Sequence, residues 1–312
     1  MQPPYHQAVH RFALFLVACT LLLLIAGALV TSNEAALSVP DWPLSYGTLL
    51  PPMVGGIVFE DSHRKIAGAV LLLTLILAIW LWRAEQRRWM RWLGVAAFGA
   101  VLGQAVLGGL TVLLNLHYGM PVAHACLAQI FFGIVVSIAL FTSNWWNADH
   151  PRLEDSGSPS VHSLAFLNAG VIFLQVVLGA GFRHKDIPIW PHLVGAGAVL
   201  ATVTWTGAAL RRRFEQSREM RLARILLHSI FGMQFLLGIG ALWSRMSTAN
   251  APQPLPVTIA FTVAHTVVGA LLFACGVGVI LVCRRLVPFQ LFEANSLLHR
   301  EEAAGRNGPR GI

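Results

Sequence analysis

Eight long apolar runs constrain this chain more than any other feature of its sequence. A helix needs about 20 apolar residues to cross the hydrocarbon core of a bilayer, and in lipid a single spanning segment must be helical to pair its own backbone groups. We place the spans at about residues 12–30, 62–82, 92–114, 120–142, 163–183, 189–210, 224–243 and 257–283. The sequence therefore predicts an all-α polytopic membrane protein with eight transmembrane helices.

The composition agrees with this class and argues against a nucleic-acid partner. Hydrophobic residues make up 56% of the chain and charged residues 12%, about half the charged fraction of soluble domains. The net charge is +8, but the basic residues gather in short loops between apolar runs, where they orient helices. The four cysteines lie inside apolar runs without a CxxC pair, so neither a disulfide framework nor a zinc site is indicated.

The distribution of charge predicts the topology. Arginines fill the loops after the second, sixth and eighth spans, whereas the loop at 32–61 has only acidic charged residues. The positive-inside rule then places both termini in the cytoplasm and the protein in the plasma membrane. We expect an N-terminal four-helix half at 1–147, a cytoplasmic linker at 148–162, a C-terminal four-helix half at 163–286 and a cytoplasmic tail at 287–312.

The two halves resemble each other in sequence. Gln104-Ala-Val-Leu-Gly in the third span is similar to Gln234-Phe-Leu-Leu-Gly in the seventh, and Leu23-Leu-Ile-Ala-Gly in the first is similar to Gln175-Val-Val-Leu-Gly in the fifth. A histidine also lies near the start of every even-numbered span. These likenesses predict two duplicated four-helix bundles, related by an axis along the membrane normal.

The four histidines of the even-numbered spans predict two haem sites toward the outer face. They are His63, His124, His192 and His265. Two parallel helices that each offer an imidazole at the same depth provide what a bis-imidazole haem requires, one nitrogen on each side of the iron. The alternative for each histidine is an interhelical hydrogen bond. Small residues one turn further on, such as Gly68 and Gly197, would leave room for a porphyrin or serve close helix packing.

Glu60 and Arg64 share a helical face with His63, because the three residues are spaced i, i+3 and i+4. Ionisable residues where a chain enters lipid indicate a functional site. Glu60 is the candidate catalytic base. The alternative is that Asp61 or Ser62 caps the helix and that Glu60 pairs with Arg64.

Further polar residues lie on the predicted outer side, among them His117, Arg183, His184 and Lys185. We interpret each as solvated at the membrane interface. Contact with the propionate groups of a haem is the alternative.

The chain resembles the haem A synthases over nearly its whole length. The resemblance rests on Gly27-Ala-Leu-Val-Thr-Ser32, on Pro40-Asp-Trp-Pro-Leu44, on Glu60-x-x-His63-Arg64 and on the histidine of each even-numbered span. It implies an oxidoreductase that converts the C8 methyl group of haem O to a formyl group by successive hydroxylations and loss of water, giving haem A for terminal oxidases.

The same resemblance implies the roles of individual residues and partners. His192 and His265 would ligate the iron of a haem b cofactor. His63 and His124 would bind the substrate haem beside Glu60, and Arg64 would contact it. A haem O synthase and an electron-transfer protein are the partners implied, and the chain can form an oligomer.

One departure from the family pattern concerns the first outer loop. Many members carry two cysteines there, at the positions of Ser38 and Ser45 in this chain. A thiol or disulfide role in the reaction is therefore not expected here.

Two readings from other classes stay open at this stage. A two-haem cytochrome b could pass electrons from a quinol, but such a relay needs haems near opposite membrane faces, whereas these histidines share one depth. A haem carrier would bind the same group without altering it, and only analysis of the product separates it from the enzyme.

Overall fold

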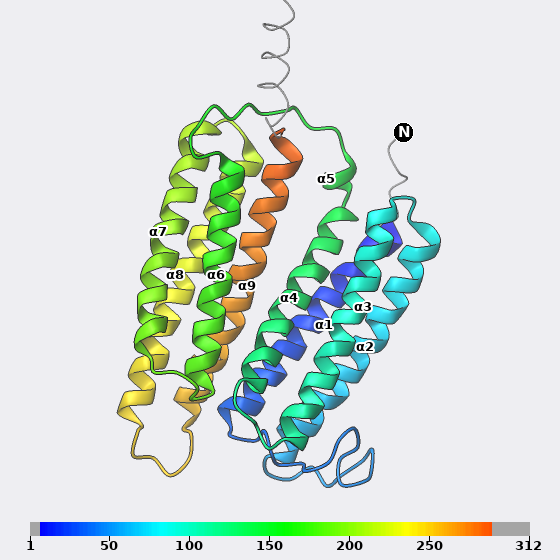
Figure 1. Cartoon of the computed structure of the whole chain (residues 1–312), viewed down its shortest axis with the longest axis vertical. Helices are drawn as coiled ribbons and strands as arrows, with labels where there is room; N and C mark the ends of the chain where they lie inside the picture. The colour runs from blue at the N-terminus through cyan, green and yellow to red at the C-terminus, as the bar shows by residue number, and fades with distance from the viewer. Residues whose placement is uncertain (1–6, 289–312) are drawn as a thin grey trace, which may run out of the picture.

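The computed structural model describes residues 7–288, which form long antiparallel helices joined by loops (Figure 1). No strand is present in this part of the chain. The helices are α1 (Gln7–Ser32), α2 (Ile57–Ala84), α3 (Arg88–Leu113), α4 (Met120–Phe141), α5 (Asn144–Asn147), α6 (Val161–Arg183), α7 (Trp190–Arg213), α8 (Arg218–Ser247) and α9 (Pro256–Leu286).

All of these helices except α5 are long and apolar enough to cross a membrane, which confirms the eight predicted spans. Most extend a few residues beyond the apolar runs, because helical hydrogen bonding continues after the side chains become polar. The short helix α5 was not predicted. It begins where the Ser143 side chain accepts a hydrogen bond from the Trp146 backbone N–H at 3.0 Å, as N-cap serines do.

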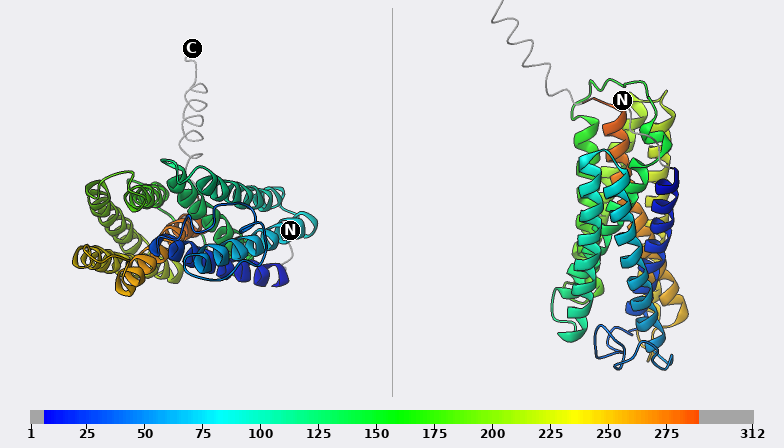
Figure 2. Two further views of the ribbon diagram at one scale, coloured as in Figure 1. Left: turned by 90° about the horizontal axis from the view of Figure 1, so that it is seen from below. Right: turned by 90° about the vertical axis from the view of Figure 1, so that its right-hand side faces the viewer.

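The long helices pack as two groups of four that lie side by side (Figures 1 and 2). Helices α1 to α4 contact one another in a ring, and so do α6 to α9. The groups meet where α1 and α4 pack against α9 and where α4 packs against α6. Phe132 of α4 and Ala270 and Ala274 of α9 are buried in this seam. The repeated arrangement supports the predicted duplication, which itself stays a prediction.

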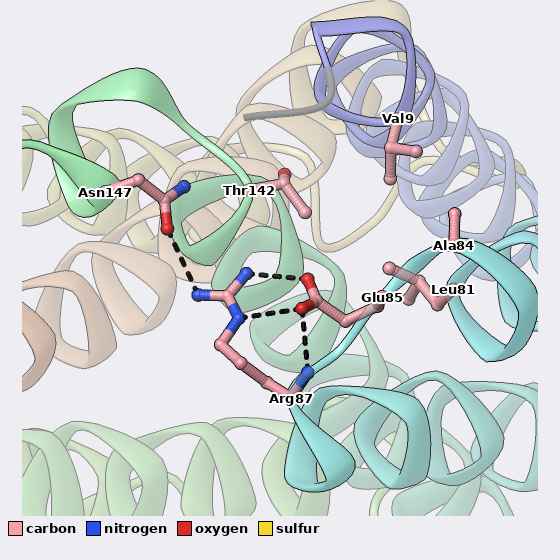
Figure 3. A pocket seen from close by; sticks show the side chains of 7 residues that line it. All are labelled: Val9, Leu81, Ala84, Glu85, Arg87, Thr142 and Asn147. Carbon is pink, nitrogen blue, oxygen red and sulfur yellow. Dashed lines mark hydrogen bonds and ion pairs between the residues drawn. The ribbon is translucent and has the colours of Figure 1, made fainter. Parts of the chain in front are cut away.

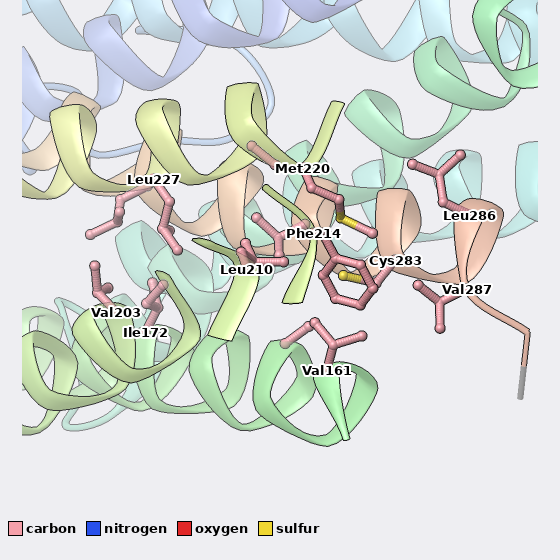
Figure 4. Close-up of a cluster of buried hydrophobic side chains, with 14 of the residues drawn as sticks. Val161, Ile172, Val203, Leu210, Phe214, Met220, Leu227, Cys283, Leu286 and Val287 are labelled. Atoms are coloured by element: carbon pink, nitrogen blue, oxygen red, sulfur yellow. The ribbon is translucent and has the colours of Figure 1, made fainter. Parts of the chain in front are cut away.

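Each group of helices has an apolar core of its own. In the second group, Leu210, Met220, Leu227 and Cys283 are among the buried side chains, and they join α7, α8 and α9 (Figure 4). In the first group, Leu16, Leu77, Met90 and Val135 are among the core residues, one from each long helix. These cores fix the helices toward one end of the bundle, away from the histidines.

Both ends of the described chain lie at the same end of the bundle, together with the arginine-rich loops (Figure 1). This is the arrangement that an even number of spans requires. Of the predicted terminal segments, residues 1–6 and 289–312 lie outside the described residues.

The prediction that Asp61 or Ser62 caps α2 is wrong. The helix begins at Ile57 with Gly56 as its N-cap and no side-chain cap, so Asp61 and Ser62 lie inside it and cap nothing. Its backbone continues past the end of the apolar run toward the outer loop, so Glu60 falls in its first turn.

An ion pair at the arginine-rich end joins the α2–α3 turn to the segment after α4. Arg87 binds both carboxylate oxygens of Glu85, at 3.0 and 2.7 Å, and also donates to Asn147 Oδ1 at 3.3 Å (Figure 3). Although burial raises it, the hydrogen bonds and the charge of Arg87 together bring the pKa of the Glu85 carboxyl below its ordinary value. The pair therefore stabilises the fold when Glu85 is ionised.

We expect Glu85→Gln to lower the free energy of unfolding by about 1–3 kcal/mol at pH 7, because Arg87 loses a charged acceptor. Since folding lowers the pKa of Glu85, its contribution is present above the ordinary value of 4.5 and is lost as the pH falls through the folded value. Thermal unfolding in detergent at pH 7 and pH 4 measures both effects. The exposed Glu215→Gln is the control. A variant as stable as the parent at pH 7, with the same pH dependence, would contradict this role.

Candidate functional site

Each of the four predicted histidines lies against a glycine of the helix that precedes its own. A Cβ atom built on that glycine would be only 2.9–3.0 Å from imidazole Cε1, closer than real Cβ contacts, in the pairs Gly27–His63, Gly108–His124, Gly179–His192 and Gly238–His265. Glycine therefore lets the imidazole lie directly on the neighbouring backbone. The four contacts lie toward the end of the bundle opposite the arginine-rich loops. A fifth and tighter contact of the same kind joins Gly207 of α7 to His228 of α8.

Three of these glycines follow a glutamine by one helical turn, and the glutamine also contacts the histidine. Gln104 Nε2 donates to the His124 carbonyl oxygen at 2.9 Å, and Gln175 Nε2 donates to that of His192 at 2.8 Å. Gln234 Nε2 lies 3.4 Å from His265 Nε2. The Gln and Gly of each Gln-x-x-x-Gly repeat therefore both contact the histidine of the next helix.

A backbone carbonyl group orients one of the four imidazoles by a hydrogen bond, and the other three lie near such groups. His265 Nδ1 donates to the Gln234 carbonyl oxygen at 3.1 Å, which leaves the Nε2 lone pair directed away from that carbonyl. His63, His124 and His192 face the corresponding carbonyls of Leu23, Gln104 and Gln175. Their Nδ1 atoms are buried and form no full hydrogen bond. A neutral imidazole held in this way is a typical metal ligand.

His192 and His265 face each other at a separation that suits one metal ion between them. Their ring centroids are 6.2 Å apart and their planes are at 87°. A metal–imidazole bond is about 2 Å and the nitrogen lies about 1 Å from its ring centre, so two rings that share one metal ion have centroids about 6 Å apart. The pair therefore fits bis-imidazole ligation of a haem iron.

His63 and His124 form the second pair, in the first group of helices. The two imidazoles are close enough to interact electrostatically. A Cβ atom built on Gly68 or Gly197 would meet nothing within 4 Å, because both glycines lie on the exposed surface of their helices. By contrast, Gly195 and Gly269 lie against the side chains of Gln175 and Gln234. That these small residues leave room for a porphyrin stays a prediction.

Glu60 and Arg64 tie the first outer loop to α2. Glu60 is 4% exposed, and its Oε2 accepts from the Val39 backbone N–H at 2.9 Å while its Oε1 accepts from Arg64 at 2.7 Å. Arg64 also donates to the carbonyl oxygens of Asp41 and Leu44, at 2.7 and 2.9 Å. The Glu60 side chain is therefore buried and fixed one helical turn from His63.

Two further residues of this region have contacts that sequence reasoning did not predict, namely Asp61, which it considered only as a helix cap, and Trp42. Asp61 accepts a hydrogen bond from Ser45 at 2.7 Å and pairs with Lys65 at 2.6 Å, so the serine at a family cysteine position holds the loop. The Trp42 ring packs on Gly109, next to the glycine that contacts His124. Its only sequence signal was its place in the Pro40–Leu44 motif.

An apolar pocket lies between α1 and α9, and none of the four histidines is among its lining residues. Its volume is about 280 Å³, and its lining includes Ile25 and Leu29 of α1 and Ala264 of α9. The first two residues flank Gly27, which contacts His63, and Ala264 precedes His265. The pocket therefore lies where the two groups of helices meet.

Comparison with known proteins identifies relatives of the chain. Residues 57–189 match the COX15-CtaA family model, described as cytochrome oxidase assembly protein. The chain is 24% identical to a haem A synthase of Bacillus licheniformis, over 79% of this chain and 90% of that protein. It is 25% identical to one of Shouchella clausii, over 93% and 92%. It is 32% identical to one of Geobacillus kaustophilus, over 58% and 59%.

The glycine contacts generate a matched test. We expect Gly179→Ala to displace the His192 imidazole at a cost of about 1–3 kcal/mol, because the new Cβ overlaps it, and so to weaken low-spin haem absorbance. Gly170→Ala in the same helix is the control, since a Cβ there meets nothing within 4 Å. Absorbance spectra at equal helical content, measured by circular dichroism, distinguish the two. Equal spectra for both variants would show that the contact does not position His192.

Proposed function

The chain belongs to the haem A synthase family, and we propose that it oxidises the C8 methyl group of haem O to a formyl group by successive hydroxylations and loss of water. The observation that carries this proposal is the 6.2 Å separation of the His192 and His265 rings, which suits a haem iron. The second histidine pair, His63 and His124 in the first group of helices, supports a second haem. One haem is then the resident cofactor and the other the substrate.

In this proposal the two halves of the chain divide the work. His192 and His265, in the half at 163–286, hold a haem b cofactor. His63 and His124, in the half at 1–147, bind haem O. The bound cofactor supplies the one-electron chemistry that protein side chains lack. The histidines fix the depth and tilt of each ring, and the glycines beneath them set the imidazole orientation.

Glu60 is the proposed base. Oxidation of a methyl group releases protons, and a carboxylate one turn from a ligand of the substrate haem can accept them at Oε1 or Oε2. The hydrogen bonds from Val39 and Arg64 hold this carboxylate in place and favour its charged form. Arg64 is the proposed contact of the bound haem O, and it also holds the outer loop and Glu60 by hydrogen bonds.

The proposed setting follows from the charge distribution. The arginine-rich end of the bundle lies in the cytoplasm with both termini, and the histidines lie toward the outer face of the plasma membrane. The pocket between α1 and α9 supports lateral access of a lipid-soluble haem from the bilayer. A haem O synthase and an electron-transfer protein are the proposed partners.

The direct test is analysis of the product. We expect the chain expressed beside a haem O source, in cells that supply its electron-transfer partner, to yield haem A when pigments are extracted and identified by chromatography and mass. Recovery of haem O unchanged, despite a low-spin spectrum, would contradict the synthase and favour the carrier. Electron transfer from quinol without a new pigment would favour the cytochrome.

The substitution Glu60→Gln distinguishes a catalytic role of Glu60 from a purely structural one. Glutamine keeps the size and one hydrogen-bond acceptor of the side chain but removes its charge. We expect the variant to fold, to keep its haem b spectrum, to bind haem O and to form little or no haem A. A structural tie alone would cost about 1 kcal/mol of stability and leave turnover intact. Glu34→Gln, in the same outer loop, is the control. Haem A at the parental level in Glu60→Gln would remove Glu60 from the reaction.

A further inference from the structure

Arg183, at the end of α6, lies in the seam between the two groups of helices. We expected it to be solvated at the interface, but the guanidinium is turned into the protein. One terminal nitrogen donates to the Ala28 carbonyl oxygen at 2.9 Å and to Ser32 Oγ at 2.8 Å, both in α1. The other donates to Thr266 and to the Thr262 carbonyl oxygen, both in α9. Arg183 therefore bridges three helices.

The charge of Arg183 has no counter-ion among residues 7–288. No carboxylate lies within ion-pair distance of it there, and the charged side chain that acts on it is the like charge of Arg245. Every acceptor it contacts is a neutral hydroxyl or carbonyl oxygen. A partly buried cation at membrane depth is costly without a compensating anion. The position of Arg183 therefore indicates that an anionic ligand binds there.

The position of Arg183 places it between the two candidate haem sites. Ala28 follows Gly27, against which His63 rests, and Thr266 follows His265. His184, the next residue, interacts electrostatically with His124. The guanidinium therefore contacts residues that are sequence neighbours of Gly27 and of His265, one from each histidine site.

Resting on the proposed function, we propose that Arg183 binds a propionate carboxylate of a haem held by one of these histidine pairs. Haem is an anion whose charge resides on its two propionates, and a guanidinium binds a carboxylate with two parallel N–H···O bonds. The contact to the Thr262 carbonyl is long, at 3.5 Å, so it can be exchanged for a carboxylate oxygen. Arg183 then positions the substrate or the cofactor from the seam between the two groups of helices.

The test compares haem b with its dimethyl ester, which has the same ring and iron but no carboxylates. Both are titrated into the full-length chain produced without haem, and affinity is read from low-spin absorbance. We expect the unaltered chain to bind haem b about 10- to 100-fold more tightly than the ester. We expect Arg183→Gln to lose most of this preference while keeping its affinity for the ester, and Arg183→Lys to keep part of it.

The control is Lys185→Gln, which removes one positive charge from an exposed side chain two residues away and should preserve the preference. The same titrations in the His63→Ala and His192→Ala backgrounds identify which haem supplies the carboxylate. An unaltered chain that binds haem b and ester equally would overturn the proposal, as would an Arg183→Gln variant that weakens both equally and so reveals only a structural bridge. No low-spin absorbance from the unaltered chain with either pigment would instead overturn the proposed function.

Discussion

The contact between an imidazole and a glycine backbone is the interaction on which both candidate sites depend. In lipid, helices gain little from burying apolar surface and associate instead through close packing and hydrogen bonds. Glycine allows that approach, and here the space it provides is filled by a histidine ring. Because Gly179 and Gly238 hold His192 and His265 from the sides of α6 and α8, the two rings meet across the second group of helices at the separation a single iron requires.

The charged side chains gather at the two ends of the bundle. Most of the arginines lie at one end of the bundle, where Arg87 and Arg213 form ion pairs with Glu85 and Asp155. At the other end the charges are used in pairs: Glu60 with Arg64 and Asp61 with Lys65 fasten the outer loop over the first histidine pair. Arg183 differs from these pairs, since it enters the seam with only neutral acceptors. That difference is why a carboxylate from a bound haem is its natural partner.

Much of this could be predicted from sequence, because hydropathy alone fixes spans in a membrane. The eight helices follow from apolar runs, and the histidines stand out as polar residues at repeated positions. The glycines beneath them could not be assigned, since Gly68, Gly170 and Gly179 look alike until helix rotation decides which one faces a ring. The direction of the Arg183 side chain depends on how the two groups of helices pack, which no local pattern encodes. The beginning of α2 at Ile57 was missed because its first turn is not part of the apolar run.

The central claim is that each group of helices holds one haem between its own two histidines. Electron paramagnetic resonance of the oxidised chain, purified with haem O supplied, tests it most directly when combined with the haem-to-protein ratio. The account predicts two low-spin bis-imidazole signals, of which His192→Ala removes the one present without haem O and His63→Ala the one that haem O adds. A single signal, abolished by either substitution, would contradict it, because one haem would then be ligated from both groups of helices.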